Sequence, residues 1–151
     1  MTPLLLAIHI LAAVFWVGGM AFAYTILRPA AGQFEPPIRL ALWRRVFAGF
    51  LPWVGVSIVA LLASGAGIVL AVFGGFDRLP LYVNAMMGLG VVMALIYLYL
   101  VLSPWPRFRT AADQGAIAEA AAALDRIRIA VAVNLALGIV TVLAGATGRY
   151  W

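Results

Sequence analysis

Residues 4–27 read LLLAIHILAAVFWVGGMAFAYTIL, an apolar stretch that contains the only histidine of the chain, His9. At 1.5 Å per residue, ~20 helical residues cross the ~30 Å of hydrocarbon in a bilayer, and this stretch is long enough to do so. A helix satisfies its own backbone hydrogen bonds, as any chain inside lipid must. The stretch therefore predicts a membrane-spanning helix with a histidine inside it.

Three more apolar stretches of similar length follow, at about residues 53–73, 81–102 and 129–147. Each is again close to the ~20 residues that a membrane-spanning helix needs. Together with the first stretch they predict an all-α integral membrane protein. We expect a four-helix bundle that forms a single transmembrane domain over residues 1–151.

Amphipathic segments lead into the second and fourth spans. The segment IRLALWRRVFAGFLPW (38–53) carries three arginines, and Pro52 near its end predicts a kink. The segment AIAEAAAALDRIR (116–128) is rich in alanine, the strongest helix former. We therefore expect amphipathic lead-in helices at the membrane surface before spans two and four, the latter running straight into its span.

The composition excludes a soluble protein. Apolar residues make up 66% of the chain, and only 10% of the residues are charged, against about 25% in soluble domains. There is no cysteine, which excludes disulfides, iron–sulfur clusters and thiolate metal sites. The net charge of +5 comes from arginines that flank apolar stretches, which indicates contact with a lipid bilayer and no nucleic-acid partner.

The arginines are distributed unequally about the predicted spans. Eight lie in or beside the two long loops, and only Arg78 and Arg149 lie on the opposite side. Positive charge favours the cytoplasmic side, so we expect a multi-pass protein of the cell inner membrane with both termini in the periplasm. The eight are Arg28, Arg39, Arg44, Arg45, Arg107, Arg109, Arg126 and Arg128.

His9 lies roughly 8 Å inside the periplasmic edge of its span, given 1.5 Å per residue. The opposite face of the helix carries Leu11, Val14 and Phe22, which suit lipid. We therefore expect His9 to point into the bundle, where an ionisable group is a candidate functional residue. A neutral imidazole hydrogen-bonded to Asn84 is the structural alternative. Helical spacing predicts a shared face for His9, Ala12, Ala13, Trp16, Gly19, Met20 and Ala23.

The other spans carry polar residues at a similar depth. Asn84 and Met87 share a face of the third span, and Ser64 and Thr141 lie on stripes of small and polar residues in the second and fourth. We expect these side chains to converge with His9 on one cavity in the outer leaflet. The alternative is that they hold helices together, at ~0.6 kcal/mol per hydrogen bond. The stripes are Ser57, Ala60, Ser64 and Gly67, and Asn134, Gly138, Thr141 and Gly145.

Aromatic residues cluster near the predicted ends of the spans. Tryptophan and tyrosine are enriched at membrane interfaces, and we expect these residues to be anchors there. They are Trp43, Trp53, Trp105, Tyr82, Tyr150 and Trp151. Trp16 lies too deep for this role, so we expect it to line a ligand or to fill the core.

The stretches HILAAVFWVGGMAFAYTILRP (9–29), RRVFAGFLPWVGVSIVALLASGAG (44–67) and YVNAMMGLGVVMALIYLYLVLSPWPRFR (82–109) resemble three helices of the copper-resistance protein D (CopD) family. The segment ALDRIRIAVAVNLALGIVTVLAG (123–145) resembles the fourth. The resemblance covers nearly the whole chain. It implies a role in copper uptake or tolerance in the cytoplasmic membrane.

The chain is also distantly similar to HemJ-type protoporphyrinogen oxidases, which share the histidine of the first helix. Those proteins carry a His-x-Lys pair early in the third helix, and the matching positions here are Asn84 and Met86. Both departures argue against the oxidase reaction. Loss of the second histidine also removes the partner needed for bis-histidine haem ligation.

Copper handling, by binding or transport, is the first functional hypothesis. Imidazole and thioether ligands suit Cu(I), and His9, Met87, Met20 and Met93 are the candidate metal ligands. One histidine and scattered methionines make weak, sequential sites, which suit an ion that must leave as well as enter. A periplasmic metal donor would be the corresponding partner.

Two other hypotheses remain open. A redox protein that binds haem b would use His9 as one axial ligand and either Met87 or an open position as the other, with Trp16 and Asn84 beside the cofactor. A non-catalytic membrane scaffold or subunit would use its polar stripes for packing only. No nucleophile–base pair or carboxylate dyad indicates an enzyme, and spans rich in small residues permit a homodimer. The glycines that would give haem space are Gly18, Gly19, Gly65, Gly67, Gly88 and Gly90.

Overall fold

The computed structural model describes residues 1–77 and 79–150, apart from the side chain of residue 149. All of its regular elements in this range are helical. The first two spans contain α1 (Thr2–Phe22), a π-helical turn (Ala23–Leu27) and α2 (Arg28–Ala31), then α3 (Pro36–Ile68) and a second π-helical turn (Val69–Phe73). The other two contain α4 (Leu81–Leu102), α5 (Pro104–Asp113), α6 (Ile117–Thr147) and a 3₁₀ turn (Gly148–Tyr150).

Four helical segments are long and apolar enough to cross a membrane, namely Thr2–Ala31, Pro36–Phe73, Leu81–Asp113 and Ile117–Thr147. The chain is therefore an all-α, multi-pass membrane protein, as predicted. The lead-in to span two differs in detail, because it is the first part of one continuous helix, α3, that begins at Pro36. Pro52 lies inside α3 and does not end it.

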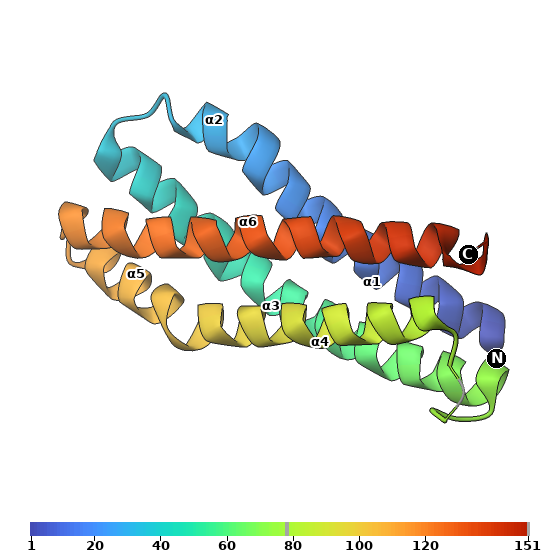
Figure 1. Ribbon diagram of the computed structural model, residues 1–151. Coiled ribbons are helices and arrows are strands. Elements are labelled where there is room, and N and C mark those ends of the chain that lie inside the picture. Colours follow the sequence, from blue (N-terminus) through green and yellow to red (C-terminus); the bar gives the residue numbers. More distant parts are fainter. Residues whose placement is uncertain (78, 151) are drawn as a thin grey trace.

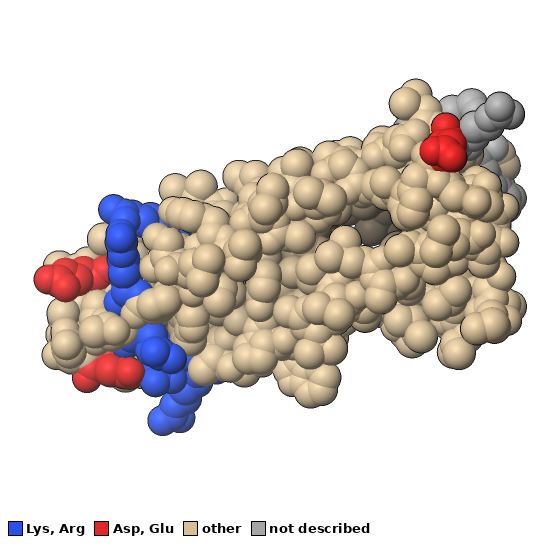
Figure 2. Space-filling model, turned by 90° about the horizontal axis from the view of Figure 1, so that it is seen from below, with Lys and Arg blue, Asp and Glu red and all other residues tan. Residues whose placement is uncertain are grey.

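The long helices form two antiparallel hairpins. The helix α1 packs mainly on α3, and α4 packs mainly on α6 (Figure 1). Both termini lie at one end of the bundle, and the loops after α2 and α5 lie at the other. Figure 2 shows the arginine side chains gathered in a band near the loop end. The predicted separation of the arginine-rich loops from the termini is thus present in the fold.

Glycine and proline account for the turns between the helices. Gly74 and Gly75 have φ values of +73° and +152°, which few other residues adopt, and they end the second span. Ser103 alone separates α4 from α5, whose first residue is Pro104. Gly115, with φ +70°, turns the chain from α5 into α6. The helix α4 ends at Leu102, where the third apolar stretch ends, whereas the helix α5 was not predicted from the sequence.

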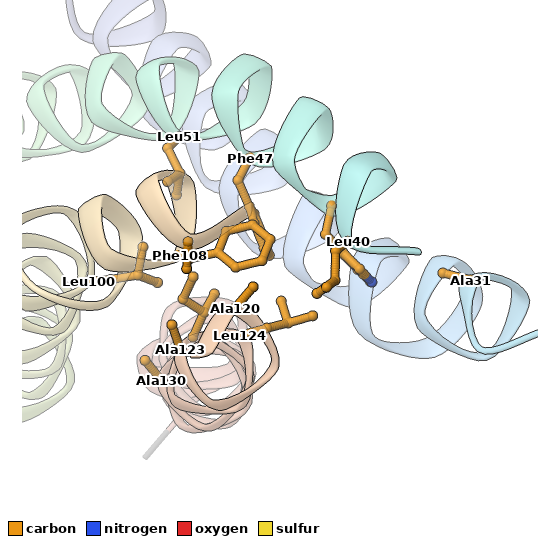
Figure 3. Close-up of a cluster of buried hydrophobic side chains, with 13 residues drawn as sticks. Ala31, Leu40, Phe47, Leu51, Leu100, Phe108, Ala120, Ala123, Leu124 and Ala130 are labelled. Atoms are coloured by element: carbon orange, nitrogen blue, oxygen red, sulfur yellow. The ribbon is translucent and has the colours of Figure 1, made fainter. Parts of the chain in front are cut away.

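A core of aromatic and alanine side chains lies at the loop end. Figure 3 shows Phe47 of α3, Phe108 of α5 and Leu124 of α6 meeting in this core. Trp43 belongs to the same core, is only 4% exposed and stacks on Phe47 with ring centroids 5.1 Å apart. The prediction that Trp43 is an interfacial anchor was therefore wrong, because the continuous helix α3 turns it inward against α5 and α6. Trp151 lies outside the described residues.

A second core lies near the middle of the spans. It consists of buried apolar side chains from all four long helices, namely Trp16, Met20, Val54, Ile58, Met93 and Leu135. The opposite face of α1, with Leu11, Val14 and Phe22, is exposed at the bundle surface. The predicted division of α1 into an interior face and a lipid face is confirmed, and Trp16 fills the core.

One hydrogen bond joins the two hairpins near Pro52. The hydroxyl of Tyr97 on α4 donates to the carbonyl of Leu51 on α3 over 2.9 Å. Gly55 leaves room for this contact, since a Cβ there would lie 2.7 Å from the hydroxyl oxygen of Tyr97. This bond ties α4 to α3 at the level where the two cores meet.

Candidate functional site

His9 points toward α3 and is half-buried. Its Nδ1 lies 3.0 Å from the hydroxyl oxygen of Ser64. Gly65 lets the ring approach the backbone of α3, because a Cβ at that position would lie 3.2 Å from the Cε1 atom of His9. The inward orientation expected from the helical face of His9 is present, and its partner is Ser64 rather than Asn84.

The hydroxyl of Ser64 determines which ring nitrogen of His9 carries the proton. Ser64 Oγ lies 2.6 Å from the carbonyl oxygen of Ala60, which can only accept a hydrogen bond. Since a hydroxyl has one proton, Ser64 donates it to Ala60 and accepts the hydrogen bond from His9 Nδ1. A neutral His9 then carries its proton on Nδ1, and its Nε2 has no hydrogen-bond partner among the described residues.

Met93 of α4 is held by three residues on one face of α6. The side-chain amide of Asn134 donates to the Met93 carbonyl over 3.3 Å. The hydroxyl of Thr141 lies 3.9 Å from the Met93 sulfur. Gly138 lies between them, and a Cβ there would be 3.2 Å from the terminal methyl carbon of Met93. Three of the four stripe residues of α6 therefore lie against the backbone or side chain of Met93, while Gly145 faces Met86.

The hydrogen bonds around Met93 leave its sulfur available. Thr141 also donates to the Leu137 carbonyl over 2.8 Å, and its single proton cannot serve both acceptors. The side-chain oxygen of Asn134 is buried without a partner in the part of the chain that the structure describes. Burying an acceptor without a hydrogen-bond partner costs about 1–3 kcal/mol of stability. Packing alone therefore does not explain the unpaired side-chain oxygen at this position.

Met20 of α1 belongs to the same buried core as Met93. The two thioethers thus come from different hairpins and share one buried core near the middle of the spans. His9 and Met20 lie eleven positions apart in α1, which is about 16 Å along a helix. The structure therefore separates the candidate ligands into an imidazole near the end that holds the termini and a pair of thioethers at mid-depth.

Two candidate residues lie apart from these positions. Asn84 is exposed and donates to the Leu79 carbonyl over 3.1 Å, at the start of α4. Met87 is 39% exposed. Among the described residues no hydrogen bond links either of them to His9. Of the residues expected to converge on one cavity, only His9 and Ser64 are in contact with each other, while Thr141 lies with Met93 instead.

The glycines that could give space for haem fall into two groups, according to whether a neighbouring side chain packs against them. A Cβ at Gly19, Gly65 or Gly67 would meet the side chains of Phe50, His9 and Leu5, respectively. These glycines therefore permit close packing of neighbouring side chains and do not leave a cavity. A Cβ at Gly18, Gly88 or Gly90 would meet nothing within 4 Å.

The described structure contains no cluster of the side chains that most often bind metal ions. Within residues 1–77 and 79–150, no group of three or more His, Cys, Asp or Glu side chains is placed to hold a metal ion. The soft donors outside such groups are the imidazole of His9 and the thioethers of the methionines.

A family model for copper resistance protein D matches residues 44–147, which is more than half of the chain. The chain belongs to this family. No curated protein and no solved structure matches it. The family match supports a copper-resistance membrane protein, in agreement with the resemblance stated above.

The match to the copper resistance protein D family covers one part of the candidate site. Met93, Asn134, Gly138 and Thr141 all lie within residues 44–147. His9, Trp16 and Met20 lie on α1, before the matched region begins. The methionine held by α6 is therefore a feature of the matched segment, whereas the imidazole belongs to the part of the chain that precedes it.

Proposed function

We propose that this protein handles Cu(I) as cargo, binding it transiently at successive sites across the membrane. The first site is the Nε2 atom of His9, and the second is the pair of thioethers of Met20 and Met93. The observation that supports the proposal best is the arrangement of Asn134, Gly138 and Thr141 around Met93, in the same buried core as Met20.

The chemistry of these residues fits Cu(I) better than harder ions. Thioether and imidazole ligands select soft monovalent copper, whereas carboxylates and carbonyls suit hard cations. Few ligands at each site give weak binding, which a path for ions requires. Asn134 adds a buried oxygen whose acceptor capacity is unused in the described structure.

The distribution of arginines favours one orientation of the path. With eight arginines at the loop end, the positive-inside rule places the termini and His9 toward the periplasm of the cell inner membrane. In this orientation, His9 would receive copper from a periplasmic metal donor. Met20 and Met93 would then hold it near the middle of the bilayer.

The test of the proposed function is metal binding by the purified protein in detergent. We expect the protein to retain Cu(I) in competition with a chromogenic chelator, and to release Zn(II) to a matched chelator. The absorption spectrum should show no Soret band. A Soret band would favour the haem hypothesis, and a colourless protein that retains neither metal would favour the scaffold hypothesis.

The hydrogen bond to Ser64 gives a sharper prediction for the first site. Ser64→Ala removes the acceptor that keeps the His9 proton on Nδ1, and loss of such an orienting partner lowers metal affinity about 10–100-fold. Competition titrations with Cu(I) measure this change. Ser57→Ala is the matched control, because Ser57 makes the same type of bond, to the Trp53 carbonyl over 2.9 Å. Equal losses in both variants would contradict the role of Ser64.

A further inference from the structure

A hollow opens at the loop end of the bundle, between the start of α3 and the turn that joins α5 to α6. Its volume is about 540 Å³, which is within the range of small-molecule binding pockets. Small residues leave it unfilled: the lining includes Ala41, Ala112, Gly115 and Ala116. The positive φ of Gly115 sets the turn that forms one wall.

The charged residues of the hollow are two arginines and one aspartate. Arg44 forms a two-point ion pair with Asp113, with Nε–Oδ1 2.9 Å and Nη2–Oδ2 3.1 Å. Both oxygens of Asp113 are thereby occupied. Arg45 also lines the hollow, is exposed and forms no ion pair among the described residues. The hollow therefore carries one positive charge that nothing in the described chain neutralises.

The position of the hollow identifies the charge that would complement it. Its lining residues belong to the loop end of the bundle, the end at which Figure 2 shows the arginine side chains gathered. Ile117, an exposed apolar side chain, belongs to its lining beside the arginines. A polar, cationic site next to an exposed apolar surface matches a molecule with a phosphate and an acyl chain. Basic pockets between transmembrane helices bind anionic lipid headgroups in this way.

We propose that this hollow binds the phosphate headgroup of an anionic phospholipid, with Arg45 as the principal cationic contact and the free Nη1 of Arg44 as a second. The ion pair with Asp113 holds the Arg44 guanidinium in place, since bidentate pairs fix geometry. The small lining residues admit the glycerol-phosphate group, and the acyl chains lie along Ile117. This site is independent of the proposed copper path.

The test is native mass spectrometry of the purified full-length protein in micelles that contain equal amounts of phosphatidylglycerol and phosphatidylcholine. We expect the wild-type protein to retain phosphatidylglycerol in preference. Arg45→Gln should reduce this occupancy about tenfold, as expected for loss of one hydrogen bond to a charged group. Ala41→Leu should reduce it similarly by filling the hollow, with no change in charge.

Arg28→Gln is the matched control, because it removes the same charge at the same end of the bundle from a residue that does not line the hollow. It should leave the occupancy unchanged. Equal losses in Arg28→Gln and Arg45→Gln would overturn the proposal in favour of unspecific surface attraction. Full displacement of the lipid by an equal concentration of inorganic phosphate would overturn it in favour of a site for free phosphate. Absence of any preference for phosphatidylglycerol would also overturn it.

Discussion

Phe108→Ala is expected to lower the free energy of unfolding by about 3 kcal/mol, near the lower end of the range for buried phenylalanines. The Phe108 ring is fully buried and lies 6.1 Å, between centroids, from both Phe47 and Trp105. Its removal leaves a cavity among α3, α5 and α6. The cavity cost persists in a bilayer, although transfer of apolar groups from protein to lipid contributes little there.

The measurement for Phe108→Ala is a titration of the refolded protein with sodium dodecyl sulfate, followed by far-ultraviolet circular dichroism. Phe22→Ala is the matched control, because Phe22 is 57% exposed on the lipid face of α1. This control should change the free energy of unfolding by less than about 0.5 kcal/mol. An equal loss in both variants would mean that the cluster at the loop end is not the core of the fold.

The double variant Met20→Leu/Met93→Leu should bind Cu(I) about 100-fold more weakly than the wild-type protein. Loss of a group that only orients a ligand already costs about 10–100-fold, and this variant removes both proposed ligands of the second site. Leucine keeps nearly the same volume, so the buried core should remain packed. Chelator competition measures the affinity, and circular dichroism shows whether the fold is retained.

Met86→Leu is the control for that variant. Met86 lies on the same helix as Met93 and packs against α6, with its sulfur 3.2 Å from the position of a Cβ at Gly145. It is not a proposed ligand, and its replacement should leave Cu(I) affinity within about twofold, as for a volume-conserving exchange. If Met86→Leu weakened Cu(I) binding as much as the double variant, the effect would not be specific to Met20 and Met93. That result would contradict their role as the second copper site.

The fold was predictable because each membrane span is recognisable in the sequence as a long apolar stretch. Apolar stretches of the necessary length, interrupted by Gly74, Gly75 and the segment around Pro104, left little choice but four helices. The exposed face of α1 could also be read from helical periodicity. The course of α3 could not, since Pro52 is compatible with either a break or a continuous helix. The structure shows a continuous helix, with Phe47 of α3 packed against Phe108 of α5.

The candidate site was predictable only within each helix. Helical spacing identified the stripe of Asn134, Gly138 and Thr141, and it predicted that the His9 side chain points into the bundle. It could not show which residue on another helix faces each stripe, because a single sequence does not fix the rotation of one helix against another. The contact between that stripe and Met93 therefore emerges only from the structure.

Binding of copper by methionine sulfur in the middle of the bundle can be tested by X-ray absorption at the copper edge of the Cu(I)-loaded protein. We expect sulfur neighbours around copper in the wild-type protein and their loss in Met20→Leu/Met93→Leu. Spectra that show only nitrogen and oxygen neighbours, or the same sulfur signal in both proteins, would contradict it.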